Sequence, residues 1–335
     1  MALFSQNIGI DLGTLYTRVA EGGQVVLEEP TVAAIVVEEQ KMVSWGREAH
    51  NMYGRVPESI EVARPLMNGV IADYEVTENI LKDILKKSGR LFRFFGPSVM
   101  ITVPDGVTSV ERRAVHEAIL QAGSKDAWLI QQPLAAAIGV DLPIGTPSGN
   151  MILCLGGGAT QAAVLAMYGI VASETLRLGG IQLDEAIVSY VRKKYGLIIG
   201  QLTAEQVKIN IGAAIPQAEE QVANLQGQDQ VTGLPRPLTL TTGEVVDALQ
   251  DPLRSIIETA RRVLEKTPPE LVSDIIDRGV ALCGGGALLR GIDKLLTKEL
   301  GVPAYLVDNP TTCTAEGAAK AHAMFGLLRR NLPPV

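Results

Sequence analysis

The chain has 335 residues, of which 47% are hydrophobic and 20% charged, a composition typical of a globular protein with two or three compact units. Its net charge is −7 and it has no long run of Lys or Arg, which argues against nucleic acid as the main partner. The first residues lack a basic segment followed by an apolar one, and no apolar run has the length of a membrane-spanning helix, so we expect neither a secretion signal nor a membrane span.

Three strands separated by turns are expected at the start of the chain. Residues 7–13, 17–22 and 23–30 read as strand, glycine turn, strand, turn and strand. Helices are predicted farther along from apolar stripes and capping boxes. The predicted helices are 77–87, the segment after a capping box at Thr108 and Glu111, the segment after a capping box at Thr203 and Gln206, 242–266, and 287–300 closed by Gly301.

The order of strands and turns at the N-terminus is repeated about 143 residues later. Residues 151–180 again read as strand, glycine turn, strand, turn and strand, so each copy is expected to open one half of the molecule. A third glycine turn, at 280–291, lies between an apolar strand and a helix. Residues 216–237 are polar and are expected to form the exposed outer part of a subdomain. Strands that alternate with helices predict an α/β fold with partly parallel sheets.

The three glycine turns suggest a nucleotide site. A strand that ends on glycines lets backbone amides face a phosphate, and two such turns from repeated halves would face each other across a cleft. The third turn would let a base and ribose approach the backbone. Any one glycine cluster could instead be a tight structural turn, but three in this order favour a bound nucleotide.

The motifs along the chain identify a family. They include "IGIDLGT", "ARPLMNGVIADYEVTE", "VPDGVTSVERRAV", "TAEQVKINIGAA", "VTGLP", "TPPELVSDIIDRGVALCGGGALLRG" and "TTCTAEG". With them, nearly the whole sequence resembles the MreB family of bacterial actin-like proteins, in the superfamily of actin, sugar kinases and large heat-shock chaperones. The chain has room neither for the sugar-binding insertions of a kinase nor for the peptide-binding domain of a chaperone.

The resemblance implies an actin-like fold, in which two repeated halves of mixed sheet and helices surround a nucleotide cleft. Residues 1–145 and 308–335 would form the first half (subdomain IA), with a small insertion (IB) at about 33–65. Residues 146–307 would form the second half (subdomain IIA), with an insertion (IIB) at about 181–240.

The resemblance also implies the residues that bind ATP and a weakly bound Mg²⁺. Asp11, Gly13 and Thr14 would form the first phosphate loop, with Asp11 reaching the metal through water. Glu205 and Lys208 would flank base and ribose, although two residues three apart on a helix could equally be a solvated pair. The other implied contacts are Gly156, Gly157, Gly158, Thr160, Gly284, Gly285, Gly286 and Ala287.

The sequence departs from the family pattern where water and metal are handled. Cys154 stands where the family has an aspartate, and Ala159 replaces a threonine. Gln161 replaces a glutamate, and so does Gln132 at the water-orienting position. Two further differences are Gln131 beside it and the pair Leu15 and Tyr16 in the first loop. A neutral thiol is a poor ligand for Mg²⁺, which prefers oxygen.

These departures predict that ATP is bound but that its hydrolysis is weak or lost, with Gln132 as a weak water-orienting residue. The alternative is a conventional ATP-hydrolysing member, in which Asp11 and ordered waters suffice and turnover drives filament disassembly. A kinase for a small substrate is a third reading, for which no substrate-pocket insertion is visible.

An aromatic cluster interrupts an otherwise phenylalanine-poor chain. Leu91, Phe92, Phe94 and Phe95 are expected on a loop between glycines, with two arginines among them, which suits insertion into an anionic membrane surface. The alternative is that they begin a strand and pack in the core. The three cysteines, by contrast, are far apart in sequence, fit no disulfide or zinc spacing, and are typical of a reducing cytosol.

The resemblance thus implies a cytoplasmic filament protein, peripheral on the inner face of the cell membrane, that organises cell-wall synthesis and rod shape. Its implied partners are further copies of itself, a paralogue of the MreB family, inner-membrane cell-elongation proteins and the membrane surface, and no nucleic acid is expected. Head-to-tail filaments follow from a repeated heterologous interface that does not close.

Overall fold

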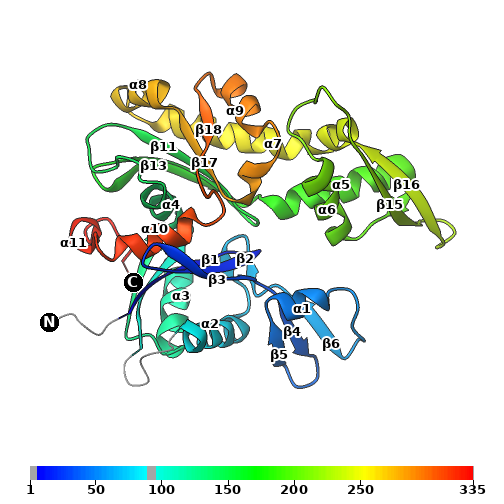
Figure 1. Cartoon of the computed structure of the whole chain (residues 1–335), viewed down its shortest axis with the longest axis horizontal. Coiled ribbons are helices and arrows are strands. Elements are labelled where there is room, and N and C mark those ends of the chain that lie inside the picture. The colour runs from blue at the N-terminus through cyan, green and yellow to red at the C-terminus, as the bar shows by residue number, and fades with distance from the viewer. Residues whose placement is uncertain (1–5, 89–95, 335) are drawn as a thin grey trace.

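The structure, a computed structural model, describes residues 6–88 and 96–334 (Figure 1). Two five-stranded sheets form the centres of two stacked halves. The first sheet has the order β10-β9-β1-β2-β3, with bounds Asp126–Gln131, Ser98–Val103, Asn7–Leu12, Tyr16–Glu21 and Gln24–Pro30. The second has the order β18-β17-β11-β12-β13, with bounds Ala304–Leu306, Val280–Cys283, Asn150–Leu155, Thr160–Ala166 and Gly169–Leu176.

The two sheets have the same topology. Strand β1 pairs antiparallel with β2 and parallel with β9, and β11 pairs antiparallel with β12 and parallel with β17. The register matches as well: Asp11 lies opposite Arg18, and Cys154, about 143 residues later, lies opposite Gln161. The repeat predicted from the sequence is therefore present strand for strand.

Smaller sheets extend each half on one side, to the right in Figure 1. They consist of β5-β4-β6 (Lys41–Trp45, Ala33–Val36, Ile60–Ala63), β14-β15-β16 (Leu197–Ile198, Val222–Asp229, Pro235–Thr241) and the two-stranded β7-β8 (Leu66–Met67, Val70–Ile71). The polar stretch 216–237 lies largely in the β15–β16 hairpin, at whose tip Val231 is 93% exposed. It is thus an exposed outer element, as expected. The domain boundaries remain a prediction.

Helices cover the sheets and fill the space between the halves (Figure 1). Their bounds are α1 Arg47–Asn51, α2 Tyr74–Ser88, α3 Ser109–Gln121, α4 Gln132–Gly139, α5 Gly180–Tyr195, α6 Gln201–Ile211, α7 Thr242–Lys266, α8 Pro269–Arg278, η1 (a 3₁₀ turn) Gly285–Leu288, α9 Ile292–Leu300, α10 Cys313–Ala321 and α11 Phe325–Leu328. The capping box at Thr108 and Glu111 is formed at the start of α3, and α7 has the predicted bounds.

Two helix predictions were wrong in detail. Thr203 does not cap a helix, because α6 already begins after Gly200 and Thr203 lies inside it. The predicted helix 287–300 is divided into η1 and α9, since Gly291 has a φ of 74°, a left-handed conformation that interrupts a helix. Gly301 ends α9 as predicted.

Helices α4 and α10 lie between the two sheets and cross at very short range (Figure 1). A Cβ atom at Gly139 would come within 1.9 Å of the carbonyl oxygen of Cys313, and one at Gly317 within 1.7 Å of that of Ala135. On the other side of α10, a Cβ at Gly9 of β1 would lie 2.2 Å from the Ala319 nitrogen. Glycine is therefore needed at each of these positions, because no side chain fits between the backbones.

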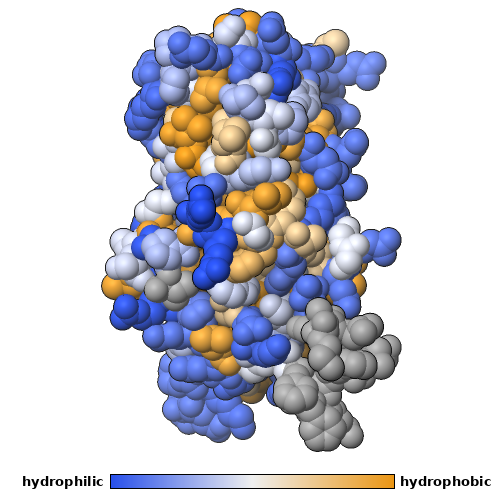
Figure 2. All heavy atoms as spheres, turned by 90° about the vertical axis from the view of Figure 1, so that its left-hand side faces the viewer, coloured by the Kyte–Doolittle hydropathy of each residue, from blue (hydrophilic) through white to orange (hydrophobic). Residues whose placement is uncertain are grey.

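None of the helices in the described part of the chain is both long and apolar enough to cross a membrane. Figure 2 shows that, on the face it presents, apolar residues form separate patches among hydrophilic ones. The predicted membrane cluster of Leu91, Phe92, Phe94 and Phe95 lies outside the described residues.

Candidate functional site

The first two glycine turns have the same geometry. The Gly13 amide donates to the carbonyl of Tyr16 (3.2 Å), and the Gly156 amide donates to the carbonyl of Ala159 (2.9 Å). A Cβ at either glycine would lie within 2.7 Å of that same carbonyl oxygen. Each turn therefore closes tightly only with glycine at its first position.

The two turns meet across the gap between the halves. A Cβ at Gly157 would lie 2.3 Å from the side chain of Leu15, and one at Gly158 would lie 2.5 Å from the Thr14 hydroxyl. Thr14 is held in turn by the backbone amide of Gly69, which donates to its hydroxyl oxygen (2.9 Å). The structure thus brings together the two loops that the sequence predicts to hold phosphates.

The N-terminus of α5 lies against the second turn. Its first amides, from Gly180 and Ile181, donate to the carbonyls of Gly156 and Gly157 (3.0 and 2.9 Å). These bonds fix the second turn against the helix, and the first amides of α5 are satisfied by carbonyl oxygens of the chain itself. The hydroxyl of Thr160 donates to the carbonyl of Leu178 (2.8 Å) and ties β12 to the segment before α5.

The third turn is open at its middle residue. Gly284 has a φ of 84°, and a Cβ there would lie 2.3 Å from the carbonyl oxygen of Leu155. Gly286 is similarly close to the Leu155 side chain, and Ala287 is buried behind the turn. Gly285 is exposed, with no atom within 4 Å of a Cβ placed on it. The turn therefore offers a flat, unfilled surface that a planar ligand could approach.

Lys208 is not a solvated side chain. Its ammonium group lies 2.7 Å from the carboxylate of Asp184 on α5 and donates to the carbonyl of Gly180 (2.9 Å). Asp184 is only 2% exposed, and this burial raises its pKa to about 6, although the charge and hydrogen bond of Lys208 lower it. Glu205, one turn earlier on α6, is half-buried and raises the Asp184 pKa further through its charge.

Asp11 is the last residue but one of β1, just before the first turn. The hydroxyl of Thr102 (2.9 Å) and the side-chain amide of Gln132 (3.3 Å) both donate to its Oδ1 atom. Burial raises the pKa of Asp11, while the charge of Arg18 and these two hydrogen bonds lower it. Among residues 6–88 and 96–334, no group of three or more His, Cys, Asp or Glu side chains is arranged to hold a metal ion.

Gln132 belongs to a longer chain of hydrogen bonds, which we call the amide relay. The backbone amide of Asp105 donates to Oε1 of Gln161 (2.8 Å), Nε2 of Gln161 donates to Oε1 of Gln132, and Nε2 of Gln132 donates to Asp11. Gln132 is the first residue of α4, whereas Gln161 is on β12 in the other sheet. The relay therefore crosses between the halves twice.

The three cysteines, remote in sequence, form one buried cluster. Cys154 and Cys283 are paired neighbours on β11 and β17, and the Cys283 thiol donates to the Cys154 sulfur (3.2 Å). Cys313 packs against Cys283, and all three are free thiols. The hydrogen bond to Cys154 and burial raise the pKa of Cys283, so this thiol stays neutral.

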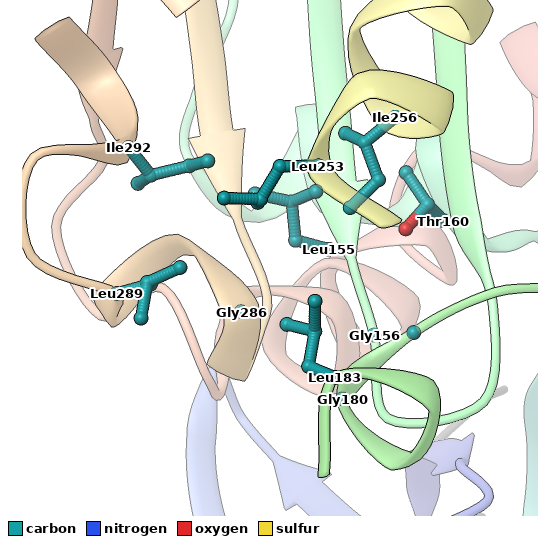
Figure 3. A pocket seen from close by; sticks show the side chains of 11 residues that line it. Leu155, Gly156, Thr160, Gly180, Leu183, Leu253, Ile256, Gly286, Leu289 and Ile292 are labelled. Carbon is teal, nitrogen blue, oxygen red and sulfur yellow. The ribbon is translucent and has the colours of Figure 1, made fainter. Parts of the chain in front are cut away.

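An apolar cavity lies behind the second and third turns (Figure 3). Leu183 of α5, Leu253 and Ile256 of α7, and Ile292 of α9 line it. Gly156 and Gly286 border it, so the two turns share a hydrophobic support.

Sequence reasoning missed three polar contributors to the site. Thr102 lies outside the motifs, Asp105 lies within "VPDGVTSVERRAV" but was given no role there, and Asp184 is an acidic residue inside an amphipathic helix. The available signal for Asp184 was its place beside the buried Leu183 and Ile187, where a carboxylate needs a partner. Gln161 was recognised as a departure from the family pattern, but its bond to Gln132 was not foreseen.

Comparison with known proteins adds an independent line of evidence. The family model described as MreB/Mbl protein matches residues 5–330. The chain is 43% identical over 331 residues to the cell shape-determining protein MreB of Escherichia coli (strain K12), covering 97% of this chain and 95% of that protein. It is 44% identical over 316 residues to the cell shape-determining protein Mbl of Bacillus cereus (strain ATCC 10987 / NRS 248), covering 94% and 95%.

Among solved structures, MreB 5 of Spiroplasma citri bound to AMPPNP superimposes with a TM-score of 0.91 at 31% identity, covering 98% of each chain. Its structure bound to ADP gives a TM-score of 0.92. This likeness confirms the predicted α/β fold of the actin-like type.

Proposed function

The chain belongs to the MreB/Mbl protein family, and on this premise we propose that it is a cell-shape protein that binds ATP and assembles into filaments. The observation that carries the nucleotide proposal is the meeting of three glycine turns, one of which is open at Gly285. The structures of MreB 5 of Spiroplasma citri bound to AMPPNP and ADP support it, since the two folds superimpose closely.

The residues fit a nucleotide in several respects. The turns at Gly13 and Gly156 would hold the phosphates, and Gly285 would face the adenosine. Lys208 would approach the ribose from its place beside Asp184. Asp11 would reach a Mg²⁺ ion through water, and such an ion would neutralise phosphate charge.

We propose further that hydrolysis is weak. Protein groups promote phosphoryl transfer mainly by positioning water and stabilising charge. Here Cys154 supplies a sulfur atom in place of carboxylate oxygens at the position that mirrors Asp11, and Gln132 already donates to Asp11. The second candidate is a conventional ATPase with turnover-driven filaments. It rests on Asp11, which keeps its carboxylate in the first turn, and phosphate release by purified protein separates the two.

Nucleotide binding is expected to raise the thermal midpoint of unfolding. ATP bound only to the folded state stabilises it by about 2.7 kcal/mol at a hundredfold excess over Kd, which shifts the midpoint by several degrees. Gly285→Val is expected to abolish the shift without unfolding the protein, because nothing in the chain occupies that space. Differential scanning fluorimetry with and without Mg-ATP measures both.

The matched control is Gly326→Val on α11, where a Cβ also meets nothing within 4 Å. This variant should keep the full shift, since α11 is not part of the three turns. Millimolar Mg-ATP without effect on the wild type would show that the cleft is not a nucleotide site.

We also propose that the protein is cytoplasmic and peripheral on the inner face of the cell membrane, where it organises cell-wall synthesis and rod shape. The support is the sequence of the 89–95 segment, in which Phe92, Phe94 and Phe95 accompany Arg90 and Arg93. Its partners would be copies of itself, a paralogue of the same family and inner-membrane cell-elongation proteins.

Phe94→Ser combined with Phe95→Ser is expected to release the protein from anionic liposomes. Each aromatic ring transferred into the lipid contributes about 1.5–3 kcal/mol. Since about 1.4 kcal/mol corresponds to a factor of ten, losing two rings should lower the partition coefficient between liposome and water by about a hundredfold or more. Flotation measures binding, and circular dichroism checks folding. Val231→Ser, which removes an exposed apolar residue at a remote hairpin tip, is the control. Unchanged flotation, or unfolding of the double variant, would assign the aromatic cluster to the core.

A further inference from the structure

The hydrogen bonds of the amide relay all point from Asp105 toward Asp11, and the two ends of the relay impose this direction. At one end the Asp105 backbone amide can only donate, and at the other the Asp11 carboxylate accepts. A side-chain amide donates from its nitrogen and accepts at its oxygen. Gln161 and Gln132 must therefore both turn their oxygens toward Asp105 and their nitrogens toward Asp11, as the structure shows.

This direction decides which end of Gln132 faces the candidate phosphate site. Its Oε1 atom is directed at Gln161, and its Nε2 atom at Asp11. A water that attacks a phosphate needs an acceptor to take up its proton and orient it. The relay instead turns a donor toward the Asp11 carboxylate, whose Oδ1 atom also accepts from Thr102.

Gln161 is well placed to hold this arrangement. It is only 2% exposed, so its amide finds its partners inside the protein. Asp105 is fixed independently of the relay: the hydroxyl of Thr175 donates to its carbonyl (2.8 Å), and that of Ser173 donates to its carboxylate. One end of the relay is thus anchored to β13, and Gln161 passes the orientation on to Gln132.

We propose that Gln161 is a positioning residue that locks Gln132 with its oxygen turned away from Asp11, and that this lock keeps ATP hydrolysis slow. The inference rests on the proposed function, because it concerns the same nucleotide site. It assigns the slow turnover to the orientation of Gln132 as well as to the absence of a carboxylate at position 154.

The sharpest test reverses the relay with one substitution. In Gln161→Glu, one carboxylate oxygen still accepts from the Asp105 amide, but the other can only accept from Gln132. With the new carboxylate ionised, Gln132 turns its nitrogen toward position 161 and its oxygen toward Asp11. Because these two acceptors cannot bond each other directly, a water would lie between them and donate to both. We expect phosphate release at saturating Mg-ATP to rise about tenfold, equivalent to about 1.4 kcal/mol in the barrier. The KM for ATP is expected to stay within about twofold, because the glycine turns are untouched.

Three further variants separate positioning from structure. Gln161→Met keeps the length of the side chain, releases Gln132 without reversing it, and should give a smaller increase. Arg177→Met removes an ion pair between the halves, to Glu111 on α3 (3.4 Å), and touches no residue of the relay, so its phosphate release should match the wild type. In a Gln132→Met background, Gln161→Glu should have no effect, since it acts only through Gln132.

Several results would overturn the proposal. These are unchanged phosphate release in Gln161→Glu, an equal rise in Arg177→Met, or a rise that persists in the Gln132→Met background. If Gln161→Glu does not fold, Gln161→Met decides, and no increase there counts against the relay. Failure of the proposed function is seen separately, as a wild-type protein whose thermal midpoint does not respond to Mg-ATP.

Discussion

Cys154→Asp combined with Gln132→Glu is expected to raise phosphate release from ATP by about 100-fold or more, the usual effect of one preorganised charge-stabilising group. The pair restores a carboxylate on the metal side and an acceptor for water. Cys283 already donates toward position 154, as Thr102 does toward Asp11, so the new carboxylate would have a hydrogen-bond donor in place. Both groups act on one transition state, and the combination should exceed the product of the single effects.

Steady-state phosphate release and the ATP-dependent thermal shift should be measured side by side. Phosphate release should rise, whereas the thermal shift should stay the same, because neither residue belongs to the glycine turns. Cys154→Ser is the matched control, since it replaces the sulfur with a neutral oxygen of similar size and should give little gain. Ala159→Thr can be added to return the hydroxyl. Rapid phosphate release by the wild type would rule out the explanation before any variant was made.

Gly317→Ala is expected to destabilise the protein by about 3 kcal/mol, the upper end of the usual cost of overpacking. Its methyl group would enter a space where the Ala135 carbonyl oxygen lies 1.7 Å away, so α4 and α10 would have to separate. Any helix-propensity gain of alanine over glycine, about 1 kcal/mol, is smaller than this cost. Because α4 begins at Gln132, the separation should also disturb the candidate site.

Urea unfolding followed by circular dichroism measures the loss. Gly326→Ala is the control, because a Cβ there meets nothing within 4 Å and the same change of residue type should be close to neutral or mildly stabilising. Equal midpoints for the two variants would show that the α4–α10 crossing has room to relax, contrary to the geometry.

Local and repeated features of the fold could be predicted from the sequence. The capping box at Thr108, the apolar stripe of α7 and the glycine turns all act within a few residues, where periodicity and turn chemistry are informative. The duplicated strand pattern was recognisable because each copy ends on the same kind of turn. The break at Gly291 was missed because helical periodicity continues across it, and only its backbone conformation reveals the interruption.

The chemistry of the candidate site was less predictable. Asp11, Gln132 and Cys154 could be identified from motifs, but the partners that fix them come from distant strands. Asp105 and Gln161 meet only because β12 and the end of β9 face each other across the halves. The cysteine cluster was likewise invisible, since spacing along the chain says nothing about residues paired across parallel strands.

The matched pairs at the ends of β1 and β11 bear on how such a protein can change during evolution. In one half the hydroxyl of Thr102 donates to the carboxylate of Asp11, and in the other the thiol of Cys283 donates to the sulfur of Cys154. A buried carboxylate left without a donor is costly, and so is a buried hydroxyl left without an acceptor. Because each pair keeps a donor in place, the acceptor can change between a carboxylate and a thiol without leaving its neighbour unpartnered. One half of a duplicated scaffold can in this way lose its charge while the other keeps its own.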